Sequence, residues 1–307
     1  MPGSLRSEKK GGGADLMSNI ALQIIIYTVI WGSIYLLISL GFSLICGVLR
    51  IFHLGYGVVF VLAAYVTWFF MEDAHLGLLP SLLLMILVQC AFALIVFYKG
   101  VFQRYLEEEE VLLTISILIF LVVAHLANYL YPVTAGVSIP STILDDVLSI
   151  GGVTIAYQMI FAALAGILVT AVYVLWFMKT RIGLIIRAIS QNLPAALLMG
   201  ANVNRMYYLA MILSVIPPTI CMIMIAPFWG VDPFMGASLL MTAMLISILG
   251  GLGNLKGSIV ASYLIGFIHA TVSFVLVSRF MGLAALIVTL VVMIYRRGGI
   301  FAGETLW

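Results

Sequence analysis

The sequence consists largely of uninterrupted apolar runs, and most of these runs are long enough to cross a lipid bilayer. A membrane-spanning helix needs about 20 apolar residues. The chain has 307 residues, of which 64% are apolar and only 8% charged. A soluble fold of this size could not bury so much apolar surface, so lipid must cover part of it. The apolar runs lie at 20–48, 54–71, 78–98, 111–131, 152–178, 206–229, 235–250, 258–278 and 281–295.

Two of these runs, 235–250 and 281–295, are short for a full crossing, so the sequence predicts eight or nine transmembrane helices. Short or glycine-interrupted runs are where broken or re-entrant helices occur, inside protein or beside water. We therefore expect an all-α integral membrane protein, a polytopic bundle with broken or re-entrant segments. No run indicates a separate soluble domain.

The domain organisation follows from the two ends of the chain. Residues 1–18 are polar and glycine-rich, and we expect them to form a disordered tail. The apolar run that follows is too long for a cleavable signal peptide, whose apolar region has about 7–15 residues. One membrane domain then covers 19–302, and 303–307 form a short tail. Cys46, Cys90 and Cys221 lie in apolar stretches and predict neither a disulfide nor a metal site.

Loop charge predicts the orientation, because Lys and Arg in short loops favour the cytoplasm. Basic loops at 99–110 and 179–205 and the C-terminal pair Arg296–Arg297 are then cytoplasmic, and the acidic segments Glu72–Asp73 and 132–150 are outside. This pattern places the N-terminus outside if 20–48 crosses once. The basic residues of the tail, Arg6, Lys9 and Lys10, favour the opposite side, so either the tail is translocated or the first region is broken.

The glycine-rich stretch GGLGNLKGS at 250–258 looks at first like a phosphate-binding loop. It lacks the GxxxxGK[ST] spacing and a preceding strand, so we predict no ATPase site in this chain. Gly253 and Gly257 instead have the small-xxx-small spacing of closely packed helices. The residues predicted to break helices or allow close packing are Gly55, Gly57, Gly250, Gly251, Gly253 and Gly257.

The ionisable residues argue against chemistry within the membrane. His53, His75, His125 and His269 are scattered, so we predict no metal site. His125 and His269 lie inside spans, where a polar side chain usually faces the bundle interior or a path. No Asp, Glu, Lys or Arg falls in the middle of a span. This absence argues against an ion-coupled carrier or an intramembrane protease, and fits a passive gated channel for a solute that another subunit drives.

The loop KTRIGLIIRAISQNLPAALLMGANVNR at 179–205 has the character of a docking element. We expect a short helix on which Ala195, Ala196, Leu198 and Met199 face one way, and Gly200 is placed to end it. Basic residues flank it on both sides. An exposed apolar face on a cytoplasmic helix should bind a partner.

This loop closely resembles the coupling loop of the branched-chain amino acid ABC permeases, whose pattern is RA…Q(D/N)…AA…MG…R. Two further blocks, GSIYLLISLGFSLICGVLRIFHLGYG (32–57) and FWGVDPFMGASLLMTAMLISILGGLGNLKGSIVASYLIGF (228–267), are similar to the same family in the same order, so the resemblance covers most of 20–302. The residues that match the coupling pattern are Arg187, Ala188, Gln191, Asn192, Ala195, Ala196, Met199, Gly200 and Arg205.

The resemblance implies a non-enzymatic permease subunit of an ABC importer in the bacterial cytoplasmic membrane. It implies as partners a second permease subunit, related or identical, two cytoplasmic ATPases that bind ATP and Mg, and an extracytoplasmic solute-binding protein. It implies no cofactor in this chain and no nucleic acid. The expected solute pathway residues are Arg50, His53, Tyr56, Asp232 and Asn254.

The solute stays open at this point. Where the family has Asn, His and Glu in the first block, this chain has His53, Tyr56 and Val58. Urea and short-amide permeases share the scaffold, so they are alternatives to branched-chain amino acids. A secondary transporter or channel without an ATPase is the alternative from another class.

Overall fold

The computed structural model describes residues 8–106, 108–131, 146–150, 153–296 and 298–301. Among these residues, eight helices are long and apolar enough to cross a membrane, and a shorter apolar helix, α10, lies between two of them. The predicted all-α polytopic fold is therefore confirmed. The membrane helices are α1 (Glu8–Leu49), α2 (Gly57–Glu72), α3 (Leu78–Phe92), α5 (Glu109–Leu130), α6 (Tyr157–Lys179), α9 (Val203–Trp229), α10 (Met235–Gly250), α11 (Leu255–Val275) and α12 (Met281–Tyr295).

Shorter elements connect these helices. A π-helical segment, η2 (Ala93–Phe102), continues α3 without interruption, and one-turn 3-10 helices, η1 (Leu54–Tyr56) and η3 (Ser278–Phe280), precede α2 and α12. The remaining elements are α4 (Gln103–Tyr105), the antiparallel strands β1 (Val147–Ile150) and β2 (Val153–Ala156), α7 (Arg181–Gln191) and α8 (Leu193–Leu198).

Helix α1 is the centre of the bundle, and it packs against α6, α9, α10 and α11. Its contact with α11 is the most extensive in the molecule, and small residues make it close. A side chain at Gly266 would meet the backbone of Gly32, and the Ser258 hydroxyl donates a hydrogen bond of 2.9 Å to the Ser43 hydroxyl. In lipid, where apolar burial drives little association, such close packing holds helices together. We call this α1–α11 contact the seam.

The turn between α10 and α11 completes the seam. α10 ends at Gly250, and Gly251 and Gly253 take φ values of +101° and +77°, which favour glycine. A side chain at Gly257 would overlap the carbonyl oxygen of Gly250, and one at Gly47 would lie 2.9 Å from the Gly253 Cα atom. The glycines of this turn therefore let α10, α11 and α1 approach one another closely.

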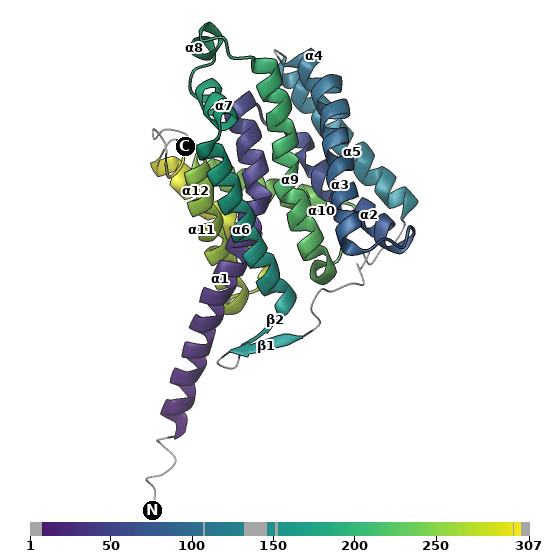
Figure 1. Cartoon of the computed structure of the whole chain (residues 1–307). Helices are drawn as coiled ribbons and strands as arrows, with labels where there is room; N and C mark the ends of the chain where they lie inside the picture. The colour runs from purple at the N-terminus through teal and green to yellow at the C-terminus, as the bar shows by residue number, and fades with distance from the viewer. Residues whose placement is uncertain (1–7, 107, 132–145, 151–152, 297, 302–307) are drawn as a thin grey trace, which may run out of the picture.

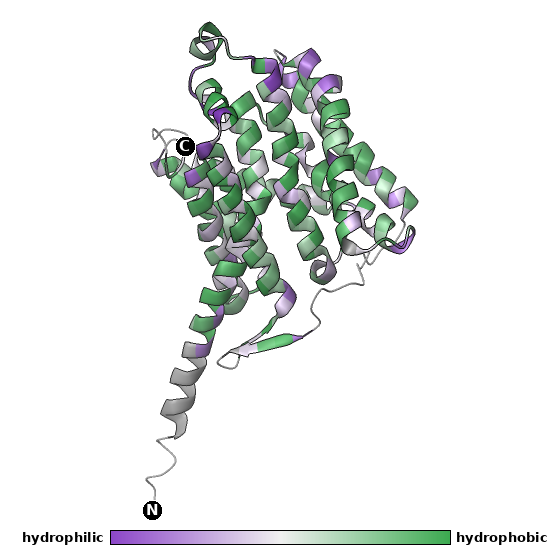
Figure 2. Cartoon of the chain, viewed as in Figure 1, coloured by the Kyte–Doolittle hydropathy of each residue, from purple (hydrophilic) through white to green (hydrophobic). Residues whose placement is uncertain are grey.

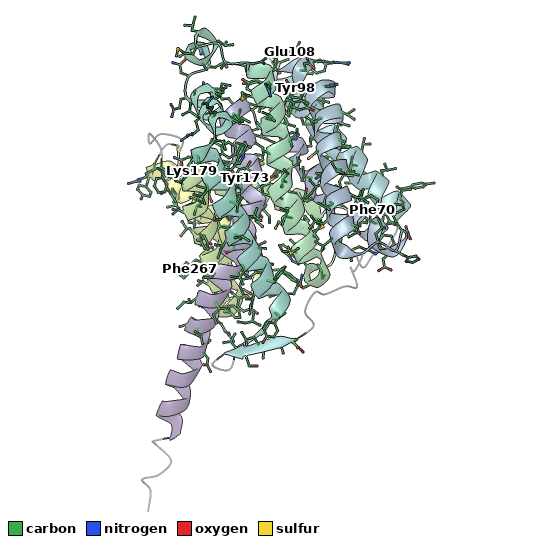
Figure 3. All side chains as sticks on the ribbon, viewed as in Figure 1. Phe70, Tyr98, Glu108, Tyr173, Lys179 and Phe267 are labelled. Carbon is green, nitrogen blue, oxygen red and sulfur yellow. The ribbon has the colours of Figure 1, made fainter. Side chains whose placement is uncertain are left out.

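The two ends of the bundle differ in their loops. Figure 1 shows α4, α7 and α8 at one end, and the beginning of α1 and the β1–β2 hairpin at the other. Figure 2 shows the helices between these ends coloured mostly as hydrophobic. In Figure 3, Tyr98 and Glu108 lie at the α4 end and Phe70 lies toward the opposite one. The basic loops 99–106 and 179–205 thus share one end, as the loop-charge argument requires of cytoplasmic loops.

The structure differs from the sequence-based expectations at three places. α1 begins at Glu8, so residues 8–18, expected to belong to a disordered tail, continue the first helix, since extending a formed helix adds one hydrogen bond per residue. α1 is unbroken to Leu49, which favours the translocated tail over a broken first region. The β1–β2 hairpin was not expected, although its residues Val147, Val153 and Ile155 favour strands.

Some expectations concern residues outside those the structure describes. These are the tail residues 1–7, the greater part of the outer loop 132–150 with Asp145, the basic residue Arg297, and the C-terminal residues 303–307. The expected organisation into a tail, one membrane domain and a second tail remains a prediction.

Candidate functional site

The segment between α6 and α9 forms two helices rather than the expected single short one. The Thr180 side chain caps α7 by accepting a 3.1 Å hydrogen bond from the Gly183 amide. The Asn192 side chain caps α8 by accepting a 3.0 Å bond from the Ala195 amide, and Pro194 stands in the first turn. α8 ends at Leu198, and Gly200 follows with a φ of +80°. Local sequence therefore fixes both ends of each helix.

Helix α7 is seated on the membrane bundle. Its Ile186 and Ile189 side chains are buried, and the helix contacts α1, α6 and α9. Gly183 is needed for this close seat, because a side chain there would overlap the Phe177 carbonyl oxygen of α6. A movement of α7 must therefore be felt by the ends of three membrane helices.

Helix α8, in contrast, projects away from the bundle. The side chains of Leu198 and Met199 are 89% and 88% exposed. Between α7 and α8 lies a hollow of about 440 Å³. Its lining residues are Leu184, Ile185, Ala188, Gln191, Asn192, Ala195, Ala196, Met199, Gly200 and Ala201.

The expectation that Ala195, Ala196, Leu198 and Met199 all face one way is wrong for Leu198. Ala195, Ala196 and Met199 line the hollow, and Ala196 is buried there, whereas Leu198 does not line it. A helix turns once in about 3.6 residues, so residue 198 lies on the side of α8 opposite to residue 196. Leu197, which the sequence argument passed over, is 54% exposed and extends the apolar surface.

Arg187 and Arg205 of the matched pattern both make hydrogen bonds in this segment, Arg187 through its side chain and Arg205 through its backbone amide. The Arg187 guanidinium donates to the carbonyl oxygens of Gly183 (3.3 Å) and Met178 (3.4 Å), so it ties α7 to the end of α6. The backbone amide of Arg205 donates to the Asn202 side chain at the start of α9. Arg187 therefore has a structural role in this conformation, and a direct role in partner binding remains a prediction.

Arg50 connects the first membrane helix to this segment. Its guanidinium donates to the carbonyl oxygens of Ser190 (2.9 Å) and Gln191 (3.1 Å), the last two residues of α7. A cation at the C-terminal carbonyls of a helix is electrostatically favourable. Arg50 also has a φ of +58°, a left-handed conformation that is uncommon for a residue with a side chain. The structure thus places Arg50 at the joint between α1 and α7.

The break between α1 and α2 buries the other two candidates of the first block. His53 is 1% exposed and lies edge-on to Phe97 and Phe102, with ring centroids 4.3 and 5.0 Å away. Burial lowers the pKa of His53 to about 3, so its ring is neutral. Tyr56 is fully buried. In this conformation both side chains support the break, and their role in a solute pathway remains a prediction.

The two candidates of the C-terminal half lie at opposite ends of α10. Asn254 is buried in the glycine turn, where its side chain caps α11 by accepting a 3.0 Å bond from the Gly257 amide. Asp232 is exposed in the turn between α9 and α10, and its Oδ1 atom accepts a 2.9 Å bond from the Phe234 amide. Of the five pathway candidates, Asp232 is the one that lines a hollow at the outer end.

No metal centre emerges from the part of the chain that the structure describes: three or more His, Cys, Asp or Glu side chains nowhere gather there. The expected absence of a cofactor remains a prediction.

A bundle of helices long and apolar enough to cross a membrane, with the α7–α8 segment seated at one end, defines a class of protein, the polytopic membrane protein. Comparison with known sequences identifies the family. Residues 24–295 match the family model described as the branched-chain amino acid transport system permease component. The chain belongs to this family, whose members are multi-pass proteins of the bacterial inner membrane.

Two curated relatives cover nearly the whole chain. The high-affinity branched-chain amino acid transport system permease protein BraD of Pseudomonas aeruginosa is 23% identical over 283 residues, which are 88% of this chain and 92% of BraD. The corresponding protein LivH of Escherichia coli K12 is 24% identical over 287 residues, 85% of this chain and 90% of LivH. No solved structure matches the chain.

Proposed function

We propose that this chain is the permease subunit of an ABC importer that moves branched-chain amino acids, or a similar small polar solute, into the cell. Two partner ATPases, which bind ATP and Mg, dock on α7 and α8 and supply the energy. A second permease subunit shares the solute path, and an extracytoplasmic binding protein delivers the solute.

The observation that carries this proposal is the exposed apolar surface of α8. Leu198 and Met199 are almost fully exposed in a loop that loop charge assigns to the cytoplasm. Two adjacent apolar side chains in water are unfavourable, at about 25 cal/mol per Å² of apolar surface that a partner could cover. They stand beside the hollow of about 440 Å³, so the surface has both projecting side chains and a recess. Such a surface indicates a protein interface.

The contacts of α7 with the membrane helices support the idea that a movement at the α8 surface reaches those helices. α7 contacts α1, α6 and α9. Arg50, at the end of α1, donates to the last carbonyl groups of α7, and Arg187 of α7 donates to the Met178 carbonyl oxygen of α6. A ligand can shift a conformational equilibrium only as far as it binds the two states differently. In this proposal, closure of the ATPase pair moves α8 and α7, and the arginine contacts convey the movement to the membrane helices.

The experiment compares two exposed sites. Leu198→Glu combined with Met199→Glu should leave the amount of folded permease unchanged, because both side chains are exposed, and should abolish both ATPase co-purification and uptake. Ala74→Glu, at an exposed residue of the opposite end next to Glu72 and Asp73, is the control and should change neither. Normal uptake by the double variant would exclude the importer and leave the secondary transporter or channel.

The names of the relatives BraD and LivH, both branched-chain amino acid permease proteins, support branched-chain amino acids as the solute. Uptake of labelled leucine, isoleucine and valine should therefore exceed uptake of labelled urea and acetamide in cells that make the complete transporter. The opposite order would assign the chain to the urea and short-amide permeases.

A further inference from the structure

Two adjacent prolines interrupt the hydrogen bonds of α9 near its middle. Pro217 and Pro218 are buried, and they are the fifteenth and sixteenth of the 27 residues of this helix. Proline has no amide hydrogen, so the carbonyl oxygens four residues earlier, on Leu213 and Ser214, lose the donor that an α-helix supplies. Two consecutive missing bonds weaken the helix at one point, and helices bend at such points.

Tyrosine hydroxyls from two other elements replace the missing donors one for one. The Tyr173 hydroxyl of α6 donates to the Leu213 carbonyl oxygen at 3.3 Å. The Tyr56 hydroxyl, at the end of η1, lies 3.3 Å from the Ser214 carbonyl oxygen and 3.4 Å from that of Ile38. Ile38 lies inside α1, where the amide four residues on is its helix donor. Ser214 is therefore the acceptor that needs the Tyr56 hydroxyl.

These bonds are enclosed by protein at membrane depth. Ser214 and Tyr56 are fully buried, and Tyr173 is buried as well. A side chain at Gly41 of α1 would overlap the Ser214 carbonyl oxygen, so the two helices meet closely there. Inside a membrane, backbone groups that a proline frees must be satisfied by neighbouring protein groups. The two hydroxyls therefore stabilise the conformation of α9 that the structure shows.

Both tyrosines belong to elements that are joined to α7. Thr180 is the one residue between α6, which carries Tyr173, and α7. Tyr56 ends the short segment that begins at Arg50, whose guanidinium is bonded to the last two carbonyl groups of α7. The first half of α9 follows α8 along the chain. A displacement of the α7–α8 segment therefore acts on both tyrosines and on the first half of α9.

We propose that Leu213–Pro218 is the hinge of the permease, and that the Tyr56 and Tyr173 hydroxyls hold it in one of its two positions. When the α7–α8 segment moves, the hydroxyls leave the two carbonyl oxygens and α9 changes its bend. The second half of α9, which leads to the outer turn at Asp232, then moves relative to the first half. This inference rests on the proposed transport function, but it requires no particular solute.

Replacing the prolines tests the hinge. Pro217→Ala and Pro218→Ala each restore one helix amide and stiffen α9, and alanine is the best helix former, so the helix itself is not endangered. Each should lower uptake at least about five-fold per amount of permease in the membrane, the change in an equilibrium that one net hydrogen bond produces. ATPase co-purification should stay at the parent's level. The labelled solute is leucine or urea, whichever the parent carries. Proline variants that transport as fast as the parent would overturn the hinge.

Double variants test the pairing of each tyrosine with its own proline. Tyr173→Phe alone should lower uptake about five-fold, because it leaves the Leu213 carbonyl group without a donor. In a Pro217→Ala chain the same change should have no further effect, since the new amide serves that carbonyl group. In a Pro218→Ala chain it should keep its full effect. Tyr56→Phe should show the opposite dependence on the two prolines. A tyrosine effect of equal size in both proline backgrounds would overturn the proposal.

Tyr98→Phe is the matched control. The Tyr98 hydroxyl also donates to a carbonyl oxygen of α9, that of Asn204, at 2.9 Å. The Tyr208 amide, four residues on in the helix, serves the same carbonyl group, so the control leaves no acceptor without a donor. Its uptake should equal the parent's, and a loss as large as that of Tyr173→Phe would count against the hinge. The docking experiment on α8 involves none of these residues. A docked ATPase with unimpaired proline variants would therefore refute the hinge and leave the importer intact.

Discussion

The seam between α1 and α11 and the α7–α8 segment are built in opposite ways, although both belong to sequence blocks that resemble one family. The seam buries nearly everything it contains: Ser43, Ser258 and the glycines that allow close approach. The α7–α8 segment buries one side of α7 and leaves Leu198 and Met199 in water. Substitutions in the seam should therefore act on folding, whereas substitutions in the segment should act on transport by a folded protein.

The largest effect is expected at Gly257. Gly257→Leu would drive a side chain into the Gly250 carbonyl group, a backbone atom that cannot rotate away. Overpacking costs about 1–3 kcal/mol, and a rigid backbone neighbour places this case at the upper end. We expect little folded permease in the membrane fraction by immunoblot. Gly282→Leu, where no atom lies within 4 Å of the added Cβ, is the control and should accumulate normally.

The second prediction reverses that pattern. Leu198→Glu with Met199→Glu should change the free energy of unfolding by no more than about 0.5 kcal/mol, as for other surface substitutions. The amount of permease in the membrane should therefore stay the same. Labelled leucine uptake should fall to background. Loss of abundance together with uptake would contradict the comparison, because it would show that α8 is part of the folded core.

An intermediate effect is expected where the two regions join. Arg50→Ala removes both bonds to the Ser190 and Gln191 carbonyls, and hydrogen bonds to a charged group contribute about 1.5–3 kcal/mol. The ATPase should still co-purify, while leucine uptake falls about ten-fold. Arg104→Ala, at an exposed residue of the same end, serves as the control. Equal uptake by the two variants would show that the Arg50 contact with the α7–α8 segment has no part in transport.

The smallest effect is expected inside the seam itself. Ser43→Ala removes the acceptor of the Ser258 hydroxyl, which retains a second bond of 3.0 Å to the Asn254 carbonyl oxygen. Hydrogen bonds between membrane helices contribute about 0.6 kcal/mol on average. The unfolding temperature in detergent should fall slightly, with uptake unchanged. If Ser43→Ala lost as much folded permease as Gly257→Leu, the hydroxyl pair, rather than close packing, would hold the seam.

The sequence predicted the features that depend on local composition. Apolar runs located every membrane helix, and the glycines predicted to break helices, among them Gly55 and Gly251, lie close to or within the observed breaks at 50–53 and 251–254. A short helix ended by Gly200 was also predicted in the 179–205 loop, and Gly200 follows α8 with a positive φ. The caps at Thr180 and Asn192, which divide the segment into two helices, are local signals as well, but the sequence analysis did not use them.

The remaining features depend on the direction in which each side chain points and on contacts between residues far apart in the sequence. Hydropathy reports neither. Arg50 bonds to residues about 140 positions away, so its part in the α7 joint has no local signature. Ala196 and Leu198 are both apolar, and only the turn of α8 separates the buried one from the exposed one.

The unbroken course of α1 has a mechanical consequence. Residues Asn19–Leu49 form one rod of about 45 Å, longer than the hydrocarbon core is thick. The rod is held along α11 and is attached through Arg50 to α7. The seam runs from Thr28 to Ser43, so α1 and α11 form one stiff body. A displacement of α1 at the Arg50 end is therefore felt at its opposite end without any relay of intermediate residues.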